Sequence, residues 1–330
     1  MSKAAELAAL IGSGQAQGNK NLLINAAMNV AQKATSATAA TGYNTIDRFA
    51  FTVANFDNAA YTYGQSSLAP AGFSNSWRVD CTTVESALAA DEYSTFYQAI
   101  EAQNLQHIAN GSSAAKSLTL SFYVKSNKTG TWGVNLYKPD NTGRQITATY
   151  TISSADTWEF KTITFAGDTA GGGIVDDNGA GIYVLWALAA GSDFTSSDST
   201  SWGNYSNAGY LYGHNVNFFD STANDWAITG IQLEIGDVAT PFEHEDYGTT
   251  QRKCKRYYEL LDTSVYPTAY SSAGIGNFFW TERKRANPTL SADTNSGSYN
   301  LNTTNTNGGY IYNGTFNANS VAGIRGSSEL

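Results

Sequence analysis

The stretch LTLSFYVKSNKTGTWGVNLY, residues 118–137, decides the fold class of this chain. Apolar and polar residues alternate along Leu118–Ser126, and Thr131–Tyr137 has a similar character. Such alternation predicts strands that bury one face. The intervening KTG at 128–130 is typical of a short turn. The sequence therefore predicts that these two strands form a β-hairpin.

Short stretches of the same kind occur throughout residues 21–248. We predict further strands at Leu22–Val30, Phe49–Phe56, Trp77–Thr82, Ile146–Ile152, Trp158–Phe165, Gly181–Ala190 and Trp226–Ile235. The segment 93–101 fits both helical and strand spacing, and we interpret it as a strand followed by a helical turn at Asn104–Ile108. Many short strands separated by turns indicate an all-β fold, an antiparallel two-sheet sandwich.

Composition supports the same fold class and excludes others. The chain has 330 residues, of which 13% are aromatic and 14% charged, and it contains 31 glycines. Such a composition is typical of strands and tight turns, and the long Leu-, Glu- and Lys-rich stretches of a helix bundle are missing. An apolar fraction of 42% is high enough for a buried core, which argues against a disordered chain.

The charge of the chain changes sign along its length. Residues 1–250 carry 11 basic and 23 acidic side chains (net −12), and residues 251–330 carry 8 basic and 5 acidic ones (net +3), which together give −9. We therefore predict three parts: a helix and linker at 1–20, the sandwich at 21–248 and a small β-module at 249–330. The module alone has too little core to be stable. A net charge of −9 argues against nucleic acid as a partner, because a nucleic-acid binder needs a basic surface.

The opening SKAAELAALIG predicts one short helix. Leu7, Leu10 and Ile11 fall on one face of it. A helix of this length is unstable alone, so we expect this face to anchor the chain to another protein; the alternative is a frayed terminus. The opening lacks the pattern of a signal peptide, and no segment is apolar enough to predict membrane insertion.

The sequence contains no recognisable catalytic or metal motif. The three histidines, His107, His214 and His244, lack metal-ligand spacing, and no nucleotide or cofactor motif is present. A glycosidase needs two carboxylates about 5–10 Å apart across a cleft, and nothing selects such a pair from the acidic groups at 176–177 and 243–246. We therefore predict no metal, no cofactor and no enzymatic activity.

Aromatic residues fall into two groups. Those within the predicted strands are expected in the core: Trp77, Trp158, Trp186 and Trp226. The long polar loop 191–213 carries four more, among Ser, Asn, Asp and Gly neighbours that are poor core partners: Trp202, Tyr205, Tyr210 and Tyr212. The loop rings either stack on a sugar or pack at a subunit interface, and we take them as candidate ligand contacts.

Several segments are similar to a known family. They are NLLINAAMNVAQKAT (21–35), YNTIDRF (43–49), IEAQNLQHI (100–108), SLTLSFYVKSNKTGTW (117–132), TYTISSADTWEFKTITFAGDT (149–169) and WAITGIQLEIGDVATPFEHEDYGTTQRKCKRYYE (226–259). Together they resemble, in the same order, a carbohydrate-binding-like domain of phage tail-fibre and other virion proteins. The opening MSKAAELAALIGSG is similar to the starts of structural proteins of marine phages. The resemblance implies a jelly-roll sandwich in a virion protein, commonly a trimeric fibre, and assigns no catalytic residue.

The leading hypothesis is a phage virion structural protein, a tail fibre or similar appendage that contacts a host-surface glycan. It implies a homotrimer that joins other virion proteins through its N-terminus and is incorporated into the virion in the host cytoplasm. Two alternatives stay open: a polysaccharide depolymerase that uses paired carboxylates, and a free carbohydrate-binding module. A head fibre or decoration protein is a further position for the same kind of molecule.

Overall fold

The computed structural model describes residues 20–262, 264–270, 273–295, 299–313 and 320–330. Contacts divide the chain into two compact units. The first unit contains the chain up to Asn29 and Ala34–Glu245, and the second contains Val30–Lys33 and Asp246–Leu330. The predicted N-terminal helix with its anchoring residues Leu7, Leu10 and Ile11 lies outside the described residues.

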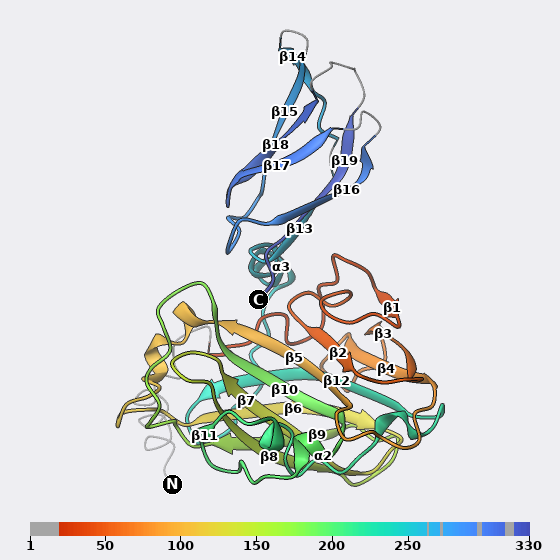
Figure 1. Ribbon diagram of the computed structural model, residues 1–330, viewed down its shortest axis with the longest axis vertical. Coiled ribbons are helices and arrows are strands. Elements are labelled where there is room, and N and C mark those ends of the chain that lie inside the picture. Colours follow the sequence, from red (N-terminus) through yellow and green to blue (C-terminus); the bar gives the residue numbers. More distant parts are fainter. Residues whose placement is uncertain (1–19, 263, 271–272, 296–298, 314–319) are drawn as a thin grey trace. The chain divides into compact units, whose positions relative to one another are not determined.

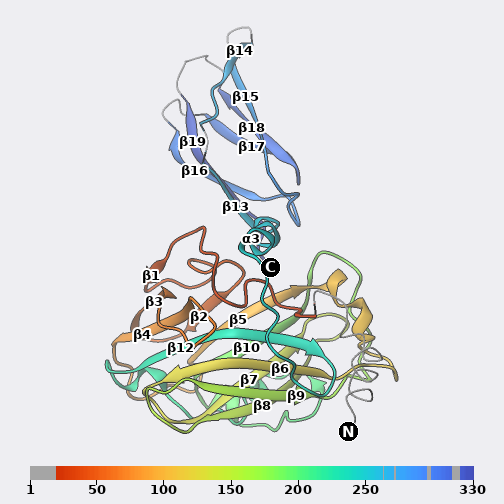
Figure 2. The ribbon, with the colours of Figure 1, turned by 180° about the vertical axis from the view of Figure 1, so that it is seen from behind.

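The first unit consists of two six-stranded antiparallel sheets packed face to face (Figures 1 and 2). The first sheet contains, in spatial order, β1 (Ser36–Thr38), β3 (Ala60–Ser66), β4 (Ser76–Thr83), β12 (Asp225–Ile235), β6 (Leu118–Ser126) and β9 (Glu159–Phe165). The second sheet contains β11 (Gly203–Asn204), β8 (Arg144–Ile152), β7 (Gly130–Lys138), β10 (Ala180–Ala190), β5 (Tyr93–Glu101) and β2 (Ala50–Ala54). The predicted all-β jelly-roll sandwich is confirmed.

Aromatic side chains from both sheets fill the space between them. The ring of Phe96 on β5 lies 4.4 Å from that of Trp77 on β4 and 6.0 Å from that of Trp226 on β12, measured between centroids. Alternation along each strand sends every second side chain into this core. Trp77, Trp186 and Trp226 are fully buried, as predicted, whereas Trp158 is half-buried and lies outside the core cluster.

The predicted hairpin between Leu118–Ser126 and Thr131–Tyr137 is wrong, although both strands exist. β6 pairs with β12 and β9 in the first sheet, and β7 pairs with β8 and β10 in the second. The chain therefore crosses from one sheet to the other at residues 127–129. Alternation specifies which face of a strand is buried, and two strands on opposite sides of a core satisfy it as well as two neighbours do.

The predicted strand at Leu22–Val30 is also wrong. Asn25 and Met28 have φ values of 60° and 58°, so the backbone turns here instead of extending. The Asn25 side chain supports the turn, because its Oδ1 accepts a hydrogen bond from the Asn29 amide at 3.0 Å. Met28 is nevertheless fully buried. The apolar pattern correctly reported burial at this position but not extended structure.

In the part of the first unit that the structure describes, residues 20–29 and 34–245, helix occurs only as short segments. β5 is followed by two 3-10 turns, η1 (Ala102–Asn104) and η2 (Gln106–Ile108), which confirms the predicted strand and helical turn. The remaining segments lie in loops: α2 (Ser192–Thr195), η3 (Asn207–Gly209) and η4 (Phe218–Asp220). None of the helices in the described ranges is long and apolar enough to cross a membrane.

The second unit contains one helix and two small sheets. The helix α3 spans Tyr247–Lys255, and the Asp246 carboxylate caps it by accepting a hydrogen bond from the Thr249 amide at 3.0 Å. One sheet contains β13 (Tyr258–Leu261), β19 (Val321–Ser327) and β16 (Thr289–Asn295), and the other contains β14 (Thr268–Tyr270), β15 (Ala273–Phe279), β18 (Gly308–Asn313) and β17 (Asn300–Asn305). The stretch RKCKRYYELL, for which strand and helix both stayed open, holds the end of α3 and all of β13.

A buried ion pair lies in the second unit. Lys284 Nζ is 2.5 Å from Glu259 Oε2, and both side chains are almost completely buried. Lys255 Nζ lies 3.7 Å from the other oxygen of the same carboxylate. The pair connects the segment after β15 to β13, beside a small core of Phe278, Trp280, Tyr299, Ile311, Val321 and Ile324.

Candidate functional site

The outer face of the second sheet carries tyrosines. Tyr97 on β5 and Tyr183 on β10 are half-exposed, while their chain neighbours Phe96 and Val184 are buried in the core. Because side chains alternate along a strand, the two tyrosines must lie on the face that points away from the core. Tyr137 on β7 occupies the same face, since it is the Cα partner of Tyr183.

Five tyrosine rings form a continuous row on this face. The Tyr137 and Tyr183 rings are stacked, with centroids 5.8 Å apart and an interplanar angle of 26°. On one side Tyr97 lies 5.9 Å from Tyr183, and Tyr43 lies 6.1 Å from Tyr97. On the other side Tyr205 lies 4.9 Å from Tyr137. We call these five residues the tyrosine row. The row runs across the strands, so the distances between successive ring centroids are of the same order as the separation of neighbouring strands, roughly 4.8 Å.

A groove of about 320 Å³ lies along the middle of the row. Its lining consists of five tyrosines, two threonines, one proline and one leucine: Thr52, Tyr93, Thr95, Tyr97, Tyr137, Pro139, Tyr183, Leu185 and Tyr210. Thr52 on β2 and Thr95 on β5 are Cα partners, so their hydroxyl-bearing side chains share one end of the groove. None of the nine lining residues carries a charge at neutral pH.

Two tyrosines at one end of the groove, Tyr205 and Tyr210, have raised pKa values, so their phenols stay protonated over the physiological pH range. Burial is the main cause that raises the pKa of Tyr205, and the neighbouring Tyr137 raises it further. Burial raises the pKa of Tyr210 even more strongly. A protonated phenol both donates and accepts hydrogen bonds. The groove therefore offers flat apolar rings with neutral polar edges.

The loop 191–213 packs over one end of the same sheet face. The Asn135 side-chain amide on β7 donates to the Tyr210 carbonyl at 2.6 Å. The Gln145 side-chain amide on β8 donates to the Ser206 carbonyl at 3.0 Å. These bonds hold the loop against β7 and β8, and Phe194 of the loop packs against Tyr93 on β5, with ring centroids 4.6 Å apart. The loop therefore covers one end of the sheet face and forms a wall at that end of the groove.

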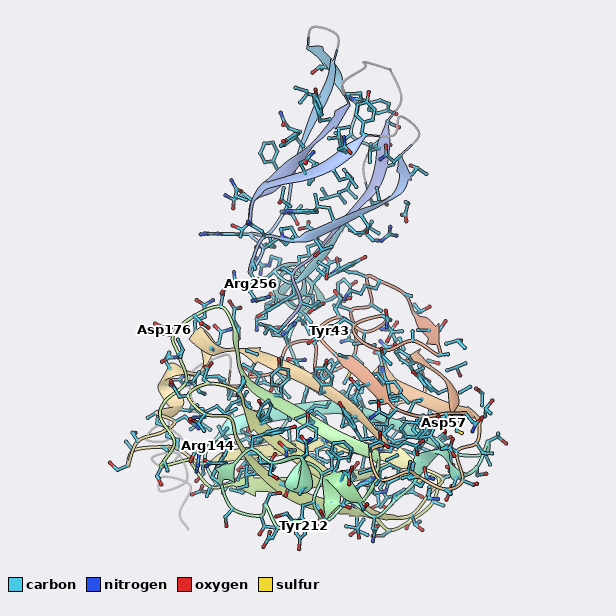
Figure 3. All side chains as sticks on the ribbon, viewed as in Figure 1. Tyr43, Asp57, Arg144, Asp176, Tyr212 and Arg256 are labelled. Carbon is cyan, nitrogen blue, oxygen red and sulfur yellow. The ribbon has the colours of Figure 1, made fainter. Side chains whose placement is uncertain are left out.

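The structure separates the four loop residues that the sequence singled out. Tyr205 belongs to the tyrosine row, and Tyr210 lines the groove, 5.6 Å from Tyr205. Trp202 packs against the main core, and its indole Nε1 donates to the Ala166 carbonyl at 2.7 Å. Tyr212 lies across the first unit from Tyr43 (Figure 3). Two of the four residues therefore adjoin the groove, and two point elsewhere.

Arg144 fixes the segment that leads to Tyr205 (Figure 3). Its guanidinium forms a two-point ion pair with Asp168, with distances of 2.7 and 2.9 Å. The same group donates to the Trp202 carbonyl and to Asn204 Oδ1, both at 3.2 Å. Arg144 thus joins the loop that carries Asp168 to β11, and Tyr205 follows β11 directly.

Sequence reasoning missed most of the tyrosine row. Four of its members were not among the candidate residues: Tyr43, Tyr97, Tyr137 and Tyr183. The last three lie inside predicted strands, where aromatic residues were expected in the core, and Tyr43 lies between two predicted strands. A usable signal exists in the strand 93–101, where Tyr93 and Tyr97 are four residues apart and therefore share a face. The adjacent Phe96 occupies the other face. Two aromatic faces on one strand indicate a core on one side and a surface site on the other.

The acidic groups that a hydrolase would need do not line the groove. Asp176 and Asp177 are exposed in a loop, outside the nine lining residues. Within the described ranges, no cluster of three His, Cys, Asp or Glu side chains has the geometry to hold a metal ion. His214 is buried, and its Nδ1 accepts a hydrogen bond from the Gly133 amide at 3.2 Å, which is a packing role.

Comparison with known proteins gives only distant similarities. No family model and no curated protein matches the sequence. Among solved structures, the enzymatically active domain of tailspike protein 4 from bacteriophage CBA120 is 12% identical, with a TM-score of 0.33 over 66% of this chain and 21% of that one. A putative sugar-binding protein from Bacteroides thetaiotaomicron is 13% identical, with a TM-score of 0.35 over 66% of this chain and 100% of that one. A family 11 carbohydrate-binding module from Clostridium thermocellum, solved with a mixed-linked tetrasaccharide, is 12% identical, with a TM-score of 0.32 over 62% and 98% of the two chains.

This chain spans about a fifth of the tailspike chain that it matches. At these identities and TM-scores we transfer no ligand or activity from any of the three proteins. One fold hosts many functions, so the function has to be inferred from the groove itself.

Proposed function

We propose that the first unit binds a neutral glycan chain along the tyrosine row. The observation that carries the proposal is the stacked pair Tyr137–Tyr183 at the centre of an uncharged groove. The C–H faces of a sugar ring are apolar and its hydroxyls are polar, which matches rings flanked by phenol and threonine hydroxyls. Because the row is longer than the groove, a chain of several sugars fits it better than a single sugar.

The affinity of one such site is expected to be low. Each ring-on-sugar contact contributes about 1 kcal/mol, by analogy with other aromatic pairs. A few such contacts correspond to dissociation constants of about a millimolar. Strong attachment to a surface then needs several copies of the site that engage together.

We further propose that this binding serves host attachment by a phage fibre or a similar virion appendage. The support is the ordered resemblance of residues 21–259 to virion proteins, described above. A homotrimer multiplies the weak sites threefold, and the apolar face of Leu7, Leu10 and Ile11 supplies the contact with other virion proteins. A free carbohydrate-binding module, or a head fibre or decoration protein, would use the same groove.

The groove favours binding over hydrolysis. A depolymerase with paired acids needs carboxylates beside the bound sugar, and the nine lining residues include none. We therefore test the hypothesis that the protein binds the glycan without hydrolysing it.

The decisive experiment is calorimetric titration of the full chain with neutral oligosaccharides, comparing wild type with the double variant Tyr137→Ala/Tyr183→Ala. We expect the variant to lose at least about tenfold in affinity, because it removes two stacking faces. Tyr137→Phe keeps the ring and should retain most of the affinity. The matched control is Tyr123→Ala, since Tyr123 is a half-exposed tyrosine on β6, in the first sheet.

Equal loss of affinity in Tyr123→Ala and in the double variant would show that the row is not the binding site. Release of reducing ends from a bound glycan would show that the protein is a hydrolase and would contradict the proposal.

A further inference from the structure

Basic side chains gather on one part of the second unit. Of the eight basic residues after position 250, four lie in the stretch 252–256 and three in the stretch 283–285. Lys255 and Lys284 share the carboxylate of Glu259. The side chain of Arg285 donates to the backbone carbonyl of Ser328 at 2.8 Å. Three of the cations, Lys255, Lys284 and Arg285, therefore have partners within the fold.

Four of the remaining five line a second cavity. It has a volume of about 410 Å³ and is formed by α3 and the segment that follows β15. Its lining residues are Thr249, Arg252, Lys253, Arg256, Glu282 and Arg283. Figure 3 marks Arg256 at this place in the second unit. Four cations and one carboxylate therefore face one cavity, in a chain whose net charge is −9.

Two of the arginines are held in place by threonines. Arg252 Nη2 donates to Thr249 Oγ1 at 3.1 Å, and Arg283 Nε donates to Thr306 Oγ1 at 3.1 Å. Each of these bonds uses one N–H group of a guanidinium that has five. The remaining donors suit an oxyanion, because a guanidinium binds carboxylate, sulfate and phosphate groups through two parallel hydrogen bonds.

The composition of the lining narrows the ligand further. All six residues are polar or charged, so the cavity offers no aromatic ring on which a nucleobase could stack, and its apolar surface is supplied by the aliphatic parts of these same side chains. Glu282 brings a carboxylate, which accepts hydrogen bonds from hydroxyl groups. A ligand that carries both an oxyanion and several hydroxyls satisfies both parts of this lining.

We propose that this cavity is a binding site for an acidic sugar, a pyranose that bears a carboxylate, sulfate or phosphate group. The oxyanion binds the arginines, and ring hydroxyls bind Glu282 and Thr249. The volume is in the range of small-ligand sites, about 300–1,000 Å³, and accommodates one sugar unit with its charged group. The site goes beyond the neutral-glycan groove, because it lies in the other unit and selects ligands by charge.

The test uses the full chain and three small probes: a galacturonate trisaccharide, a sulfated disaccharide and inorganic sulfate. Calorimetric titration at low ionic strength should show binding of at least one acidic saccharide, with an affinity that falls as salt is added. Arg283→Gln should weaken this binding by about tenfold, since a charge-assisted pair of hydrogen bonds is lost. Arg252→Gln is the second test variant, and both arginines are exposed, so neither change should unfold the unit.

Arg325→Gln is the matched control. It removes the same charge from the same unit, but Arg325 pairs with Asp293, and neither residue lines the cavity. We expect it to bind the acidic saccharide like the wild type. Equal effects of the Arg283 and Arg325 substitutions, or no binding of either saccharide, would overturn the proposal.

Two further outcomes decide the class of ligand. Inorganic sulfate that binds as tightly as the saccharides would reduce the cavity to a bare anion site, and a single-stranded oligonucleotide that binds more tightly would replace the sugar by a nucleic acid. Either result overturns the assignment. The variant Tyr137→Ala/Tyr183→Ala must bind the acidic saccharide normally, and Arg283→Gln must bind neutral glycan normally, so the two proposals fail independently.

Discussion

Arg144 and Asp168 form a two-point ion pair, and both side chains are almost completely buried. The guanidinium also holds the segment of residues 202–204, which leads directly to Tyr205 in the tyrosine row. Burial of two charged groups costs desolvation free energy, so such a pair stabilises the fold only while both partners are present. The pair therefore connects the stability of the sandwich to the geometry of one end of the tyrosine row.

The first prediction concerns this pair. Asp168→Asn leaves the Arg144 guanidinium buried without its counter-charge, which should lower the free energy of unfolding by about 3–5 kcal/mol. Urea unfolding measures the change. Asp80→Asn is the control, because Asp80 and its partner Arg78 are well exposed, and it should cost less than about 1 kcal/mol. Similar losses in both variants would contradict a structural role for the buried pair.

The second prediction concerns acid. Burial lowers the pKa of His214 from 6.5 to about 4. Below pH 6.5 this histidine is protonated in the unfolded chain but stays neutral in the folded chain. Its neutral form therefore contributes fully to stability above pH 6.5, and this contribution is lost as the pH falls toward 4. The loss should amount to about 3 kcal/mol, measured by urea unfolding at a series of pH values. His214→Gln should flatten this part of the profile, whereas a change at the exposed His244 should not.

The third prediction concerns the second unit. Lys284→Met leaves the Glu259 carboxylate buried with only the more distant and more exposed Lys255. We expect the free energy of unfolding of this unit to fall by about 3–5 kcal/mol. Unfolding of the unit is measured by the fluorescence of its buried tryptophan, Trp280. Lys284→Met/Glu259→Gln should recover part of the loss, because the unpaired charge is gone. A matched Lys255→Met variant with the same loss would disprove the special role of Lys284.

The fourth prediction concerns assembly. The sheet of β14, β15, β17 and β18 exposes Phe279 (74% exposed) and Tyr312 (39%), which lie on one face because their strands pair directly. Exposed aromatic residues of this kind are typical of subunit contacts. Sedimentation at micromolar concentration should give a species of about three times 35.3 kDa, and Phe279→Ser should shift it toward the monomer. A monomer in the wild type would contradict the trimer.

The fifth prediction concerns attachment to the particle. Deletion of residues 1–19 removes Leu7, Leu10 and Ile11, which the sequence predicts to share one helical face, and removes none of the described residues. The truncated chain should keep its thermal stability and its affinity for glycan but fail to incorporate into virions, measured by immunoblotting purified particles. Normal incorporation would exclude an anchoring role for this segment.

The two strands of the opening stretch show how far the sequence predicts the fold. The bounds predicted for β6 match the observed ones, and those predicted for β7 are one residue off at each end. Apolar and polar residues alternate along these strands because only one face of each strand is buried in the core. The pairing of these strands was wrong, because the identity of a neighbour depends on contacts made much later in the chain. Asn25 and Met28 show a second limit: local side-chain bonds produced a turn where apolar residues had indicated a strand.

The site was predicted less well than the fold, for a related reason. Tyr205 and Tyr210, which adjoin the candidate groove, were among the predicted contacts because a ring among polar loop residues stands out. Tyr137 and Tyr183 were not, because a tyrosine inside a strand looks the same whether it faces the core or the solvent. The two tyrosines are neighbours because β7 pairs with β10. Which strands pair cannot be read from the pattern of a single sequence, so their proximity could not be predicted.

The crossing of the chain between the two sheets after β6 has a consequence for the order of folding. Consecutive strands pair in β3–β4 and β7–β8, but β12 pairs with β4 and β6, and β10 pairs with β5 and β7, across long stretches of chain. Contact order is therefore high, and a slow search through long loop closures is expected. The tyrosine row collects rings from positions 43 to 205, and no fragment released early from the ribosome contains them all. The complete tyrosine row is thus among the last features that the nascent polypeptide acquires, and the glycan binding that we propose for it would report on complete folding of the sandwich.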